Sequence, residues 1–434
     1  MEVPFKHAPH YALDEHDLRR PLVKEMHLRS WPPFDAPCHV VQLVRLVDRD
    51  YEFASDARLN KVVSGPLQLG ARHTNGELTG GVHFTCERHN EATTTTLFSL
   101  SGTDELEWDI HRVTSLREPL QWACSLPGKV MRATHILICR DEAEAEALLP
   151  SIGFSRQELV SCYIGGSEKT RGARIWSDFR IHENDFGLTL MAANDLPREE
   201  LSRWAQRLQE LGNYRNLALL GLPLAREGWD RLDATEEGLA SLARNVLEAS
   251  ADDTVILDEI TTLTMRLARD SASIDYRMDA TEAYGAIVLD RLADLNVGKV
   301  SGFQSLVDFT QRRLLPALRT CQAHRRRSAQ LEQRLQEFAA LLRTRVETRI
   351  ERQNAMVLVS MERNSERQLR LQQLVEGLSV VAISYYAIGI LEHFATSIRN
   401  VFDLDLHYGV SASAPLVFVI VWMLIRRAKS RLET

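Results

Sequence analysis

The sequence predicts an α+β (mixed) protein whose N-terminal domain is followed by helices and a C-terminal two-helix transmembrane hairpin. Three observations support this prediction. Short runs rich in Thr, Val and Phe are confined to residues 1–195, a stretch without Gly or Pro covers residues 317–376, and two apolar runs lie near the C-terminus. With 434 residues, 44% hydrophobic and 26% charged, the chain has an ordinary globular composition and room for two or three structural units.

Residues 1–195 are predicted to form a mixed α/β domain. The expected strands are rich in β-branched and aromatic residues: residues 38–47, 81–89, 93–100, 134–139, 159–165, 173–181 and 186–193. A helix is expected in "DEAEAEALL" (residues 141–149), and "HEND" (residues 182–185) has the composition of a hairpin turn.

Residues 196–320 are predicted to be helical. The stretch that begins at Asp195 has a capping residue, Pro197 in the first turn and early acidic residues, which are helix-start signals. Breaks are expected near "GLPLAREGWD" and "NVGKVSG". Tyr214 and Arg215 precede the first break, and we expect them to be packing residues.

Residues 321–373 are predicted to form a long stalk helix that starts after Pro316. A continuous helix over the 60 residues from Ala317 to Glu376 would be roughly 90 Å long. Apolar residues recur at steps of three and four, with polar interruptions, as in an imperfect coiled coil. Two interpretations remain open: the helix self-associates as a stalk, or it packs on its own domain.

Two apolar runs predict transmembrane helices at residues 374–391 and 406–425. The first has 18 residues and is ambiguous alone, since it contains Glu376 and could be a core helix. The second has 20 residues without Asp, Glu, Lys or Arg. Two spans separated by a short loop, residues 392–405, would form a hairpin. The alternative is two buried helices of a soluble core.

Basic residues predict the orientation of this hairpin. They gather before the first span and in the tail, residues 426–434, whereas the loop contains only Arg399. Because cytoplasmic flanks are enriched in Lys and Arg, both termini should be cytoplasmic in a multi-pass protein of the bacterial inner membrane. The orienting residues are Arg363, Arg367, Arg370, Arg426, Arg427, Lys429 and Arg431.

The charge distribution and the cysteines limit the possible partners and compartments. The net charge is −7, and residues 323–373 and the tail together carry +8, so the remainder carries −15. Such a remainder should not attract nucleic acid. Six cysteines without a C-x-x-C pair favour a reducing compartment. The N-terminus lacks the apolar segment of a cleavable signal peptide.

Two polar clusters are candidate sites. "HFTCERH" contains Glu87 and His89, and "SDFRIHEND" contains Asp178, Arg180 and His182, which would share one face of a strand. On a strand, His83 and His89 point away from Cys86, which is poor geometry for one metal ion, so a polar strand face is favoured over a metal site. "YIGGSEKTRG" favours a hairpin loop over a phosphate-binding loop, because a strand follows it. No catalytic signature is present, and we expect neither an enzyme nor a cofactor.

Several long stretches resemble one family. They are "MHLRSWPP", "FTCERHNEATTTTLF", "SDFRIHENDFG", "RWAQRLQELGNYRNLALLGLPLAR", "RRLLPALRTC", "LLRTRVETRIERQN" and "LQQLVEGLSVVAISYYAIGI". From about Leu18 to Leu391 the chain resembles the bacterial uncharacterised membrane-anchored protein family, domain of unknown function 3422. The resemblance implies membrane anchoring in proteobacteria and brings no activity, substrate or catalytic residue.

The order of domain, stalk and two spans also resembles the layout of CorA-type magnesium channels. The Gly-Met-Asn signature of those channels is missing here, since the corresponding stretch is "YYAIGILEH". The analogy therefore concerns only the fold. If the first span lined a pore, Ser379, Tyr386 and Gly389 would be the candidate pore-facing residues.

The sequence therefore supports three hypotheses about function. The first is a homo-oligomeric scaffold, sensor or partner-binding module, anchored in the bilayer through stalk and spans, with a cytoplasmic protein or a metal ion as an unidentified partner. The second is a CorA-like ion channel or transporter. The third is an enzyme, which requires Glu87, His89, Asp178, Arg180 and His182 to converge in one cavity.

Overall fold

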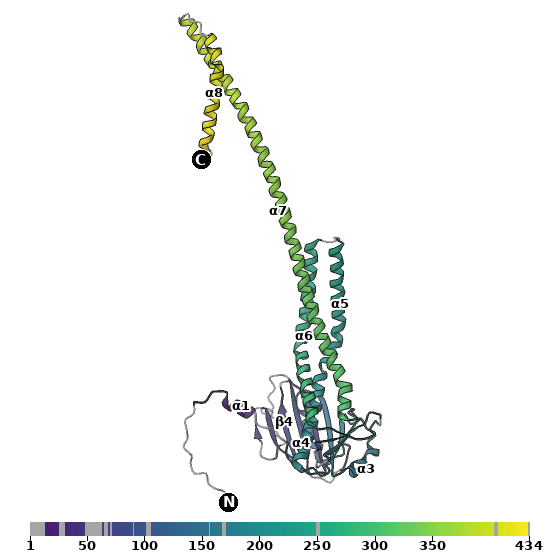
Figure 1. Ribbon diagram of the computed structural model, residues 1–434. Helices are drawn as coiled ribbons and strands as arrows, with labels where there is room; N and C mark the ends of the chain where they lie inside the picture. The colour runs from purple at the N-terminus through teal and green to yellow at the C-terminus, as the bar shows by residue number, and fades with distance from the viewer. Residues whose placement is uncertain are drawn as a thin grey trace. The chain divides into compact units, whose positions relative to one another are not determined.

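The structure, a computed structural model, confirms a mixed α+β chain with an N-terminal sheet domain and a long C-terminal helix (Figure 1). It describes residues 14–25, 31–47, 63–64, 68–69, 72–89, 91–100, 106–155, 157–166, 171–248, 252–402 and 407–432. The chain divides into two compact units. The first unit comprises residues 1–248 and 260–336, and the second unit comprises residues 249–259 and 337–434.

Within the described part of the first unit, ten strands form one sheet in the order β10-β7-β8-β9-β6-β1-β5-β4-β3-β2. The strands are β1 (Cys38–Leu46), β2 (Gln68–Leu69), β3 (His73–Leu78), β4 (Val82–Arg88), β5 (Ala92–Ser99), β6 (Lys129–Cys139), β7 (Val160–Ile164), β8 (Ala173–Ser177), β9 (Gly187–Ala192) and β10 (Gly298–Lys299). All neighbouring pairs are antiparallel except β6 and β9, which are parallel.

The predicted strands are all present, because their β-branched and apolar residues are buried from both sides. In β5, "ATTTTLFS", every residue is buried. Thr is suited to this position, since its methyl group packs while its hydroxyl group can hydrogen-bond across strands. An example is Gln42 in β1, whose Nε2 donates to Thr96 Oγ1 in β5 at 3.0 Å.

Helices cover both faces of the sheet. One face packs against α4 (Arg198–Leu219), α6 (Asp253–Asp294) and the start of α7 (Leu306–Phe402) in the largest core cluster. The other face packs against α2 (Arg117–Ser125) in one cluster and near α3 (Glu142–Ile152) in another. The remaining helices are α1 (Arg19–Glu25), the 3-10 turn η3 (Thr114–Leu116), α5 (Gly221–Leu247) and α8 (His407–Leu432).

Two predictions about strands are corrected. The strand expected over residues 173–181 ends at Ser177, because Phe179 has a φ of 52°, which no strand residue adopts. The expected turn is present: the amide of Asp185 donates to the carbonyl of His182 at 2.9 Å. In addition, "NVGKVSG" supplies β10, a two-residue edge strand that pairs with β7.

The helices differ from the prediction at two places. Pro316 lies inside α7 rather than before it, so the helix begins at Leu306. A proline within a helix costs about 3 kcal/mol, but Leu314 and Ala317 beside it are buried in the head of the helix and offset that cost. At the other end α7 continues to Phe402, so residues 392–402, expected in a loop, are helical.

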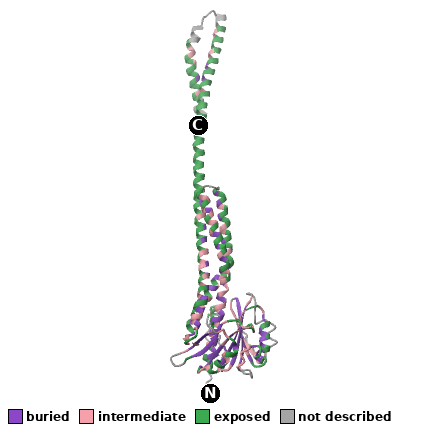
Figure 2. Cartoon of the chain, turned by 90° about the vertical axis from the view of Figure 1, so that its right-hand side faces the viewer, coloured by how far each residue is buried: buried purple, intermediate pink, exposed green. Residues whose placement is uncertain are grey.

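In the second unit, most of α7 is exposed (Figure 2). Among the described residues, α7 is the one helix long and apolar enough to cross a membrane, and its most apolar 18-residue window is 11% buried. For α8 the structure describes the side chains of residues 412–427. The predicted second span, residues 406–425, thus lies partly outside the described residues, and so do residues 403–405 of the predicted loop.

Candidate functional site

The five polar residues singled out from the sequence do not converge. Glu87 ends β4 and His89 follows it, whereas Asp178, Arg180 and His182 follow β8. Four strands, β9, β6, β1 and β5, separate β8 from β4 in the sheet. Because neighbouring strands lie about 4.8 Å apart, one cavity cannot contain both groups. The arrangement required by the enzyme hypothesis is therefore absent.

Glu87 and His89 make separate local contacts. A carboxylate oxygen of Glu87 lies 3.7 Å from Nδ1 of His73, the residue opposite it on β3. The His89 ring packs edge-on against Tyr214 of α4, with the ring centres 6.3 Å apart. These contacts are typical of a polar strand end that packs against a helix.

Asp178 organises the loop that follows β8. Its carboxylate is buried and accepts hydrogen bonds from the amides of Ser155 (3.3 Å) and Arg180 (3.1 Å). His182 Nε2 lies 3.2 Å from the same carboxylate. Arg180 turns outward and pairs with Glu158 at 2.6 Å. The loop brings Asp178 and His182 together, but by turn geometry rather than by strand alternation as predicted.

Phe179 links this loop to two helices. Its ring lies 4.7 Å from that of Phe309 in the first turn of α7. The guanidinium group of Arg215, in α4, lies over both rings, at 4.6 Å from Phe179 and 5.3 Å from Phe309. A positive φ at Phe179 costs about 1–2 kcal/mol, and packing against α7 and Arg215 offsets it. The sequence analysis identified Arg215 as a packing residue but missed Phe179 and Phe309, because no local pattern connects residues 130 positions apart.

A polar layer lies between the sheet and α4, and the sequence analysis missed it. Its members come from β1, β5, β6 and α4: Gln42, Thr96, Arg132, Thr134, Gln209 and Asn213. Arg132 donates through Nη1 to the side-chain oxygens of Asn213 (2.7 Å), Gln42 (3.4 Å) and Gln209. Thr134 Oγ1 donates to the same Gln209 oxygen at 3.1 Å. This layer closes around one guanidinium group whose hydrogen-bond acceptors are neutral amides.

Gly212 makes room for Arg132 on α4. A Cβ at this position would lie 2.5 Å from Nη2 of Arg132, so only glycine lets the helix backbone approach the guanidinium group this closely. Burial lowers the pKa of Arg132 to about 9, and the charge of Arg215 lowers it further. Burial also lowers the pKa of Arg215 to about 10. Both groups are therefore charged at neutral pH at a cost in desolvation.

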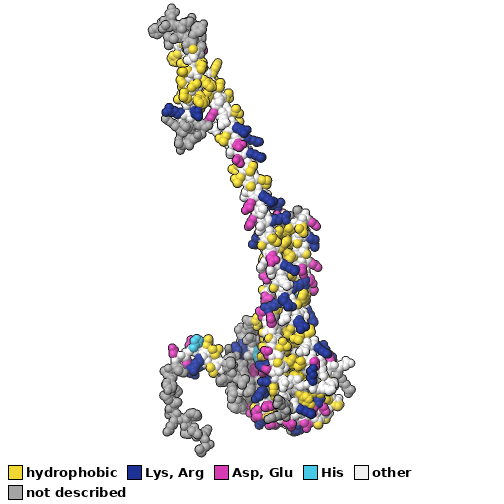
Figure 3. Space-filling model, in the orientation of Figure 1, with side chains coloured by type: hydrophobic (Ala, Val, Ile, Leu, Met, Phe, Trp, Pro, Cys, Tyr) yellow, Lys and Arg dark blue, Asp and Glu magenta, His cyan; other side chains and the backbone are white. Residues whose placement is uncertain are grey.

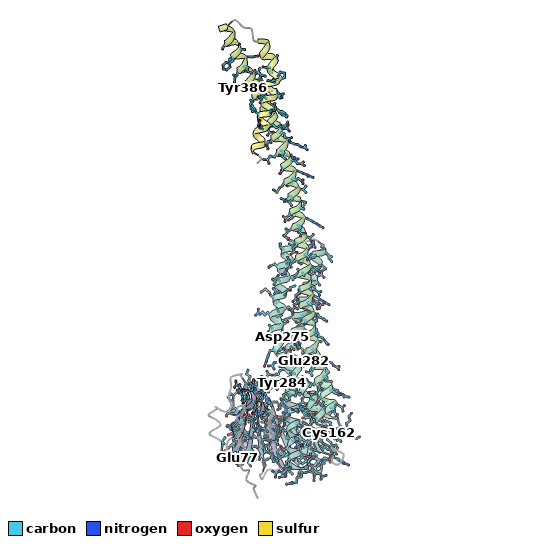
Figure 4. All side chains as sticks on the ribbon, turned by 60° about the vertical axis from the view of Figure 1, so that its left-hand side comes forward. Glu77, Cys162, Asp275, Glu282, Tyr284 and Tyr386 are labelled. Atoms are coloured by element: carbon cyan, nitrogen blue, oxygen red, sulfur yellow. The ribbon has the colours of Figure 1, made fainter. Side chains whose placement is uncertain are left out.

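A second buried charge lies beyond this layer and is paired. Glu91 binds Arg277 of α6 through two hydrogen bonds of 2.8 and 2.6 Å. Tyr284 of α6, which lies where the helix runs along the sheet (Figure 4), packs against Tyr214 with ring centres 5.8 Å apart. Burial and the nearby Glu91 charge raise the pKa of Tyr284. Here Glu91 and Arg277 neutralise each other, unlike Arg132.

Metal and thiol chemistry finds little support in the described residues. No three or more His, Cys, Asp or Glu side chains among them gather to hold a metal ion. Burial raises the pKa of Cys86 and Cys139 to about 12 and that of Cys162 to about 11, so these thiols stay protonated and unreactive. The site instead offers charge and hydrogen-bond donors.

The predicted pore-facing and orienting residues lie on exposed helix. Ser379 Oγ donates to the carbonyl of Val375 at 2.8 Å, and Tyr386 is exposed. A Cβ on Gly389 would meet no atom within 4 Å. The five orienting arginines that the structure describes are all exposed: Arg363, Arg367, Arg370, Arg426 and Arg427. The side chains of Lys429 and Arg431 lie outside the described residues.

The comparison with known proteins concerns almost the whole chain. Residues 14–432 match the family described as "Protein of unknown function (DUF3422)". The chain matches no curated protein. The match spans the sheet domain, the helices around Arg132 and Arg215, and both C-terminal helices. The chain thus belongs to the DUF3422 family of proteins of unknown function.

Proposed function

We propose that this protein is a membrane-anchored, oligomeric scaffold or sensor whose sheet domain faces the bacterial cytoplasm. One observation carries the proposal: α7 is a single helix that starts in the sheet core and ends in an exposed apolar segment. Leu306 and Leu314 at its start are buried. Of the 24 residues from Leu374 to Ser397, the large apolar ones are mostly exposed. A helix of that length is about 36 Å long, enough for the roughly 30 Å hydrocarbon core of a bilayer.

The exposed side chains of α7 and α8 support a membrane hairpin. Figure 3 shows hydrophobic side chains gathered around the end of α7 and around α8. Only four residues, 403–406, separate the two helices, a length typical of antiparallel helix pairs. Val380 and Ser384 of α7 and Val421 of α8 are buried, as expected of residues between two packed helices. Lipid would cover the remaining apolar surface.

The proposed orientation rests on the basic residues. Arg363, Arg367 and Arg370 precede the apolar segment of α7, while Arg426 and Arg427 follow that of α8. The guanidinium group of Arg426 lies 5.1 Å from the Trp422 ring, an arrangement suited to the boundary between lipid and water. With both basic clusters on the cytoplasmic side, the connection between the helices would face the opposite side.

Self-association is supported by the part of α7 that precedes the apolar segment. Ten large apolar side chains are exposed there: Ile350, Met356, Val357, Leu358, Val359, Met361, Leu369, Leu371, Leu374 and Val375. Burying one such side chain contributes roughly 1.5–3 kcal/mol. Copies anchored in one membrane present this helix in the same direction, so we propose that a second copy covers it through a parallel contact.

The proposed anchoring can be tested by alkaline carbonate extraction of membranes from a bacterium that produces the protein. The full chain should stay in the membrane pellet, and a chain that ends at Gln373 should move to the supernatant. Full extraction of the intact chain would contradict the proposal. Light scattering of the detergent-solubilised protein then gives the number of copies. A dimer supports a scaffold or sensor, whereas a closed ring of five or more copies would favour the ion-channel alternative.

A further inference from the structure

We propose that Arg132 and Arg215 form a binding site for a small oxyanion, a phosphate or a carboxylate, between the sheet and the C-terminal half of α4. This inference goes beyond the anchoring and assembly proposed above and does not depend on either. It rests on two neighbouring guanidinium groups that are held in place from several sides and that lack a carboxylate partner within the described chain.

The first observation is the nature of the partners. Among the residues that the structure describes, Arg132 bonds to amide oxygens only, and Arg215 contacts only aromatic rings. Elsewhere in the same domain the chain pairs its half-buried and buried arginines with acids. Arg277 has Glu91 at 2.6 Å, and Arg174 has Glu146 at 3.0 Å. Two adjacent positive charges without an acid are therefore an exception within this protein.

The second observation is that the two groups are neighbours. Arg132 is bonded to Asn213, and Arg215 is two residues further along α4. The charge of Arg215 reaches Arg132, since it contributes to the lowered pKa of Arg132. Two like charges that repel each other at short range gain free energy when an anion lies between them.

The third observation is that both groups are immobilised and still accessible. The amides of Gln42, Gln209 and Asn213 hold Arg132, and Gly212 lets Nη2 lie against the helix backbone. Phe179 and Phe309 hold the face of the Arg215 guanidinium group, which leaves its N–H edge for a ligand. Both arginines are half-buried rather than fully enclosed. A fixed, partly desolvated guanidinium group binds phosphate and carboxylate through paired N–H···O bonds.

The site also has a route to the rest of the molecule. Phe309, against which Arg215 lies, is in the first turn of α7, and Phe179 belongs to the loop organised by Asp178. An anion that draws the Arg215 guanidinium group toward Arg132 would weaken its contact with the two rings. Binding at this site would thus be linked to the packing of the start of α7.

The test uses the full chain in detergent and follows thermal unfolding by tryptophan fluorescence. Sodium phosphate or sodium malonate is titrated against sodium chloride at constant ionic strength. We expect saturating oxyanion to raise the unfolding temperature by about 5 °C. Arg215→Gln, which breaks no hydrogen bond of the fold, should lose this rise. Arg215→Lys, which keeps the charge without the planar donors, should keep less than half of it.

Arg207→Gln is the matched control. Arg207 lies on the same helix with its guanidinium group over the Trp204 ring at 4.8 Å, so its loss removes one charge and one ring contact from α4. This variant should respond to oxyanions as the unaltered protein does. Calorimetric titration of phosphate gives the affinity independently of unfolding. No response to either anion, or equal responses in Arg215→Gln and the unaltered protein, would overturn the proposal.

Discussion

The buried pair of His39 and His135 makes stability depend on pH. Nδ1 of His39 lies 3.0 Å from Nε2 of His135, and both side chains are buried. Burial, and then the neighbouring His39, lower the pKa of His135 well below its usual value. The unfolded chain therefore binds a proton on this residue at a pH where the folded chain does not. Folding stability that is present above about pH 6.5 is lost as the pH falls below it.

We therefore predict that the unfolding midpoint falls between pH 7 and pH 5. The loss should approach about 1.4 kcal/mol per pH unit for this residue. His135→Gln should flatten the dependence, whereas His16→Gln, at an exposed position, should leave it unchanged. Urea titrations followed by tryptophan fluorescence measure the effect. An unchanged slope in His135→Gln would show that other groups cause the acid sensitivity.

Gly212 gives a prediction about the polar layer. Gly212→Ala would place a methyl group 2.5 Å from Arg132 Nη2, so the guanidinium group or the helix must shift. We expect destabilisation of about 1–3 kcal/mol, the usual effect of overpacking a buried position. Gly377→Ala is the control, because its Cβ would meet no atom within 4 Å. The helix propensity of alanine should make that variant neutral or slightly stabilising. Equal unfolding midpoints for the two variants would contradict the close contact.

At the level of single residues, the sequence predicted little of this site. Asp178, Arg180 and His182 were expected on one strand face, but Phe179 leaves the extended conformation because Phe309 and Arg215 pack against it. The polar layer draws residues from positions 42, 96, 132 and 213. Only the pairing of β1 with β5 and β6, and the packing of α4 on them, brings these residues together.

At the level of elements, prediction succeeded where a local pattern carries the information. β5 is recognisable because four threonines in a row favour a strand whatever their partners are. β10 was missed because two residues have no pattern, and its position is set by pairing with Cys162 and Tyr163 of β7. The start of α7 was misplaced because Pro316 is a strong local signal against a helix, which tertiary packing overrides.

The exposed stripe on α7 gives a prediction about assembly. Val357 and Val375 lie on one side of the helix, five turns apart, whereas Gln373 lies on the opposite side. If a second copy covers this stripe, Val357→Glu with Val375→Glu should place charges in the contact and weaken self-association at least tenfold. Gln373→Glu, which adds a charge on the other side, should have little effect. Analytical ultracentrifugation in detergent measures both, and unchanged association of the double variant would exclude this stripe as the contact.

At the level of the whole molecule, α7 connects two kinds of environment through one element. Its start is buried with the sheet in the largest core cluster, and its later residues expose apolar side chains. Because a helix transmits an axial displacement along its length, a change at Phe309 would be felt by residues further along α7. This is how the proposed oxyanion site and the proposed membrane anchor could act in one sensor.

The central claim is that α7 and α8 form a membrane hairpin with both ends in the cytoplasm, and reporter fusions in a bacterial host test it directly. Alkaline phosphatase, which is active only after export, is fused after residue 403 or after residue 434. We predict high phosphatase activity for the fusion after residue 403 and background activity for the fusion after residue 434. Background activity in both fusions, or high activity in the C-terminal fusion, would contradict the claim.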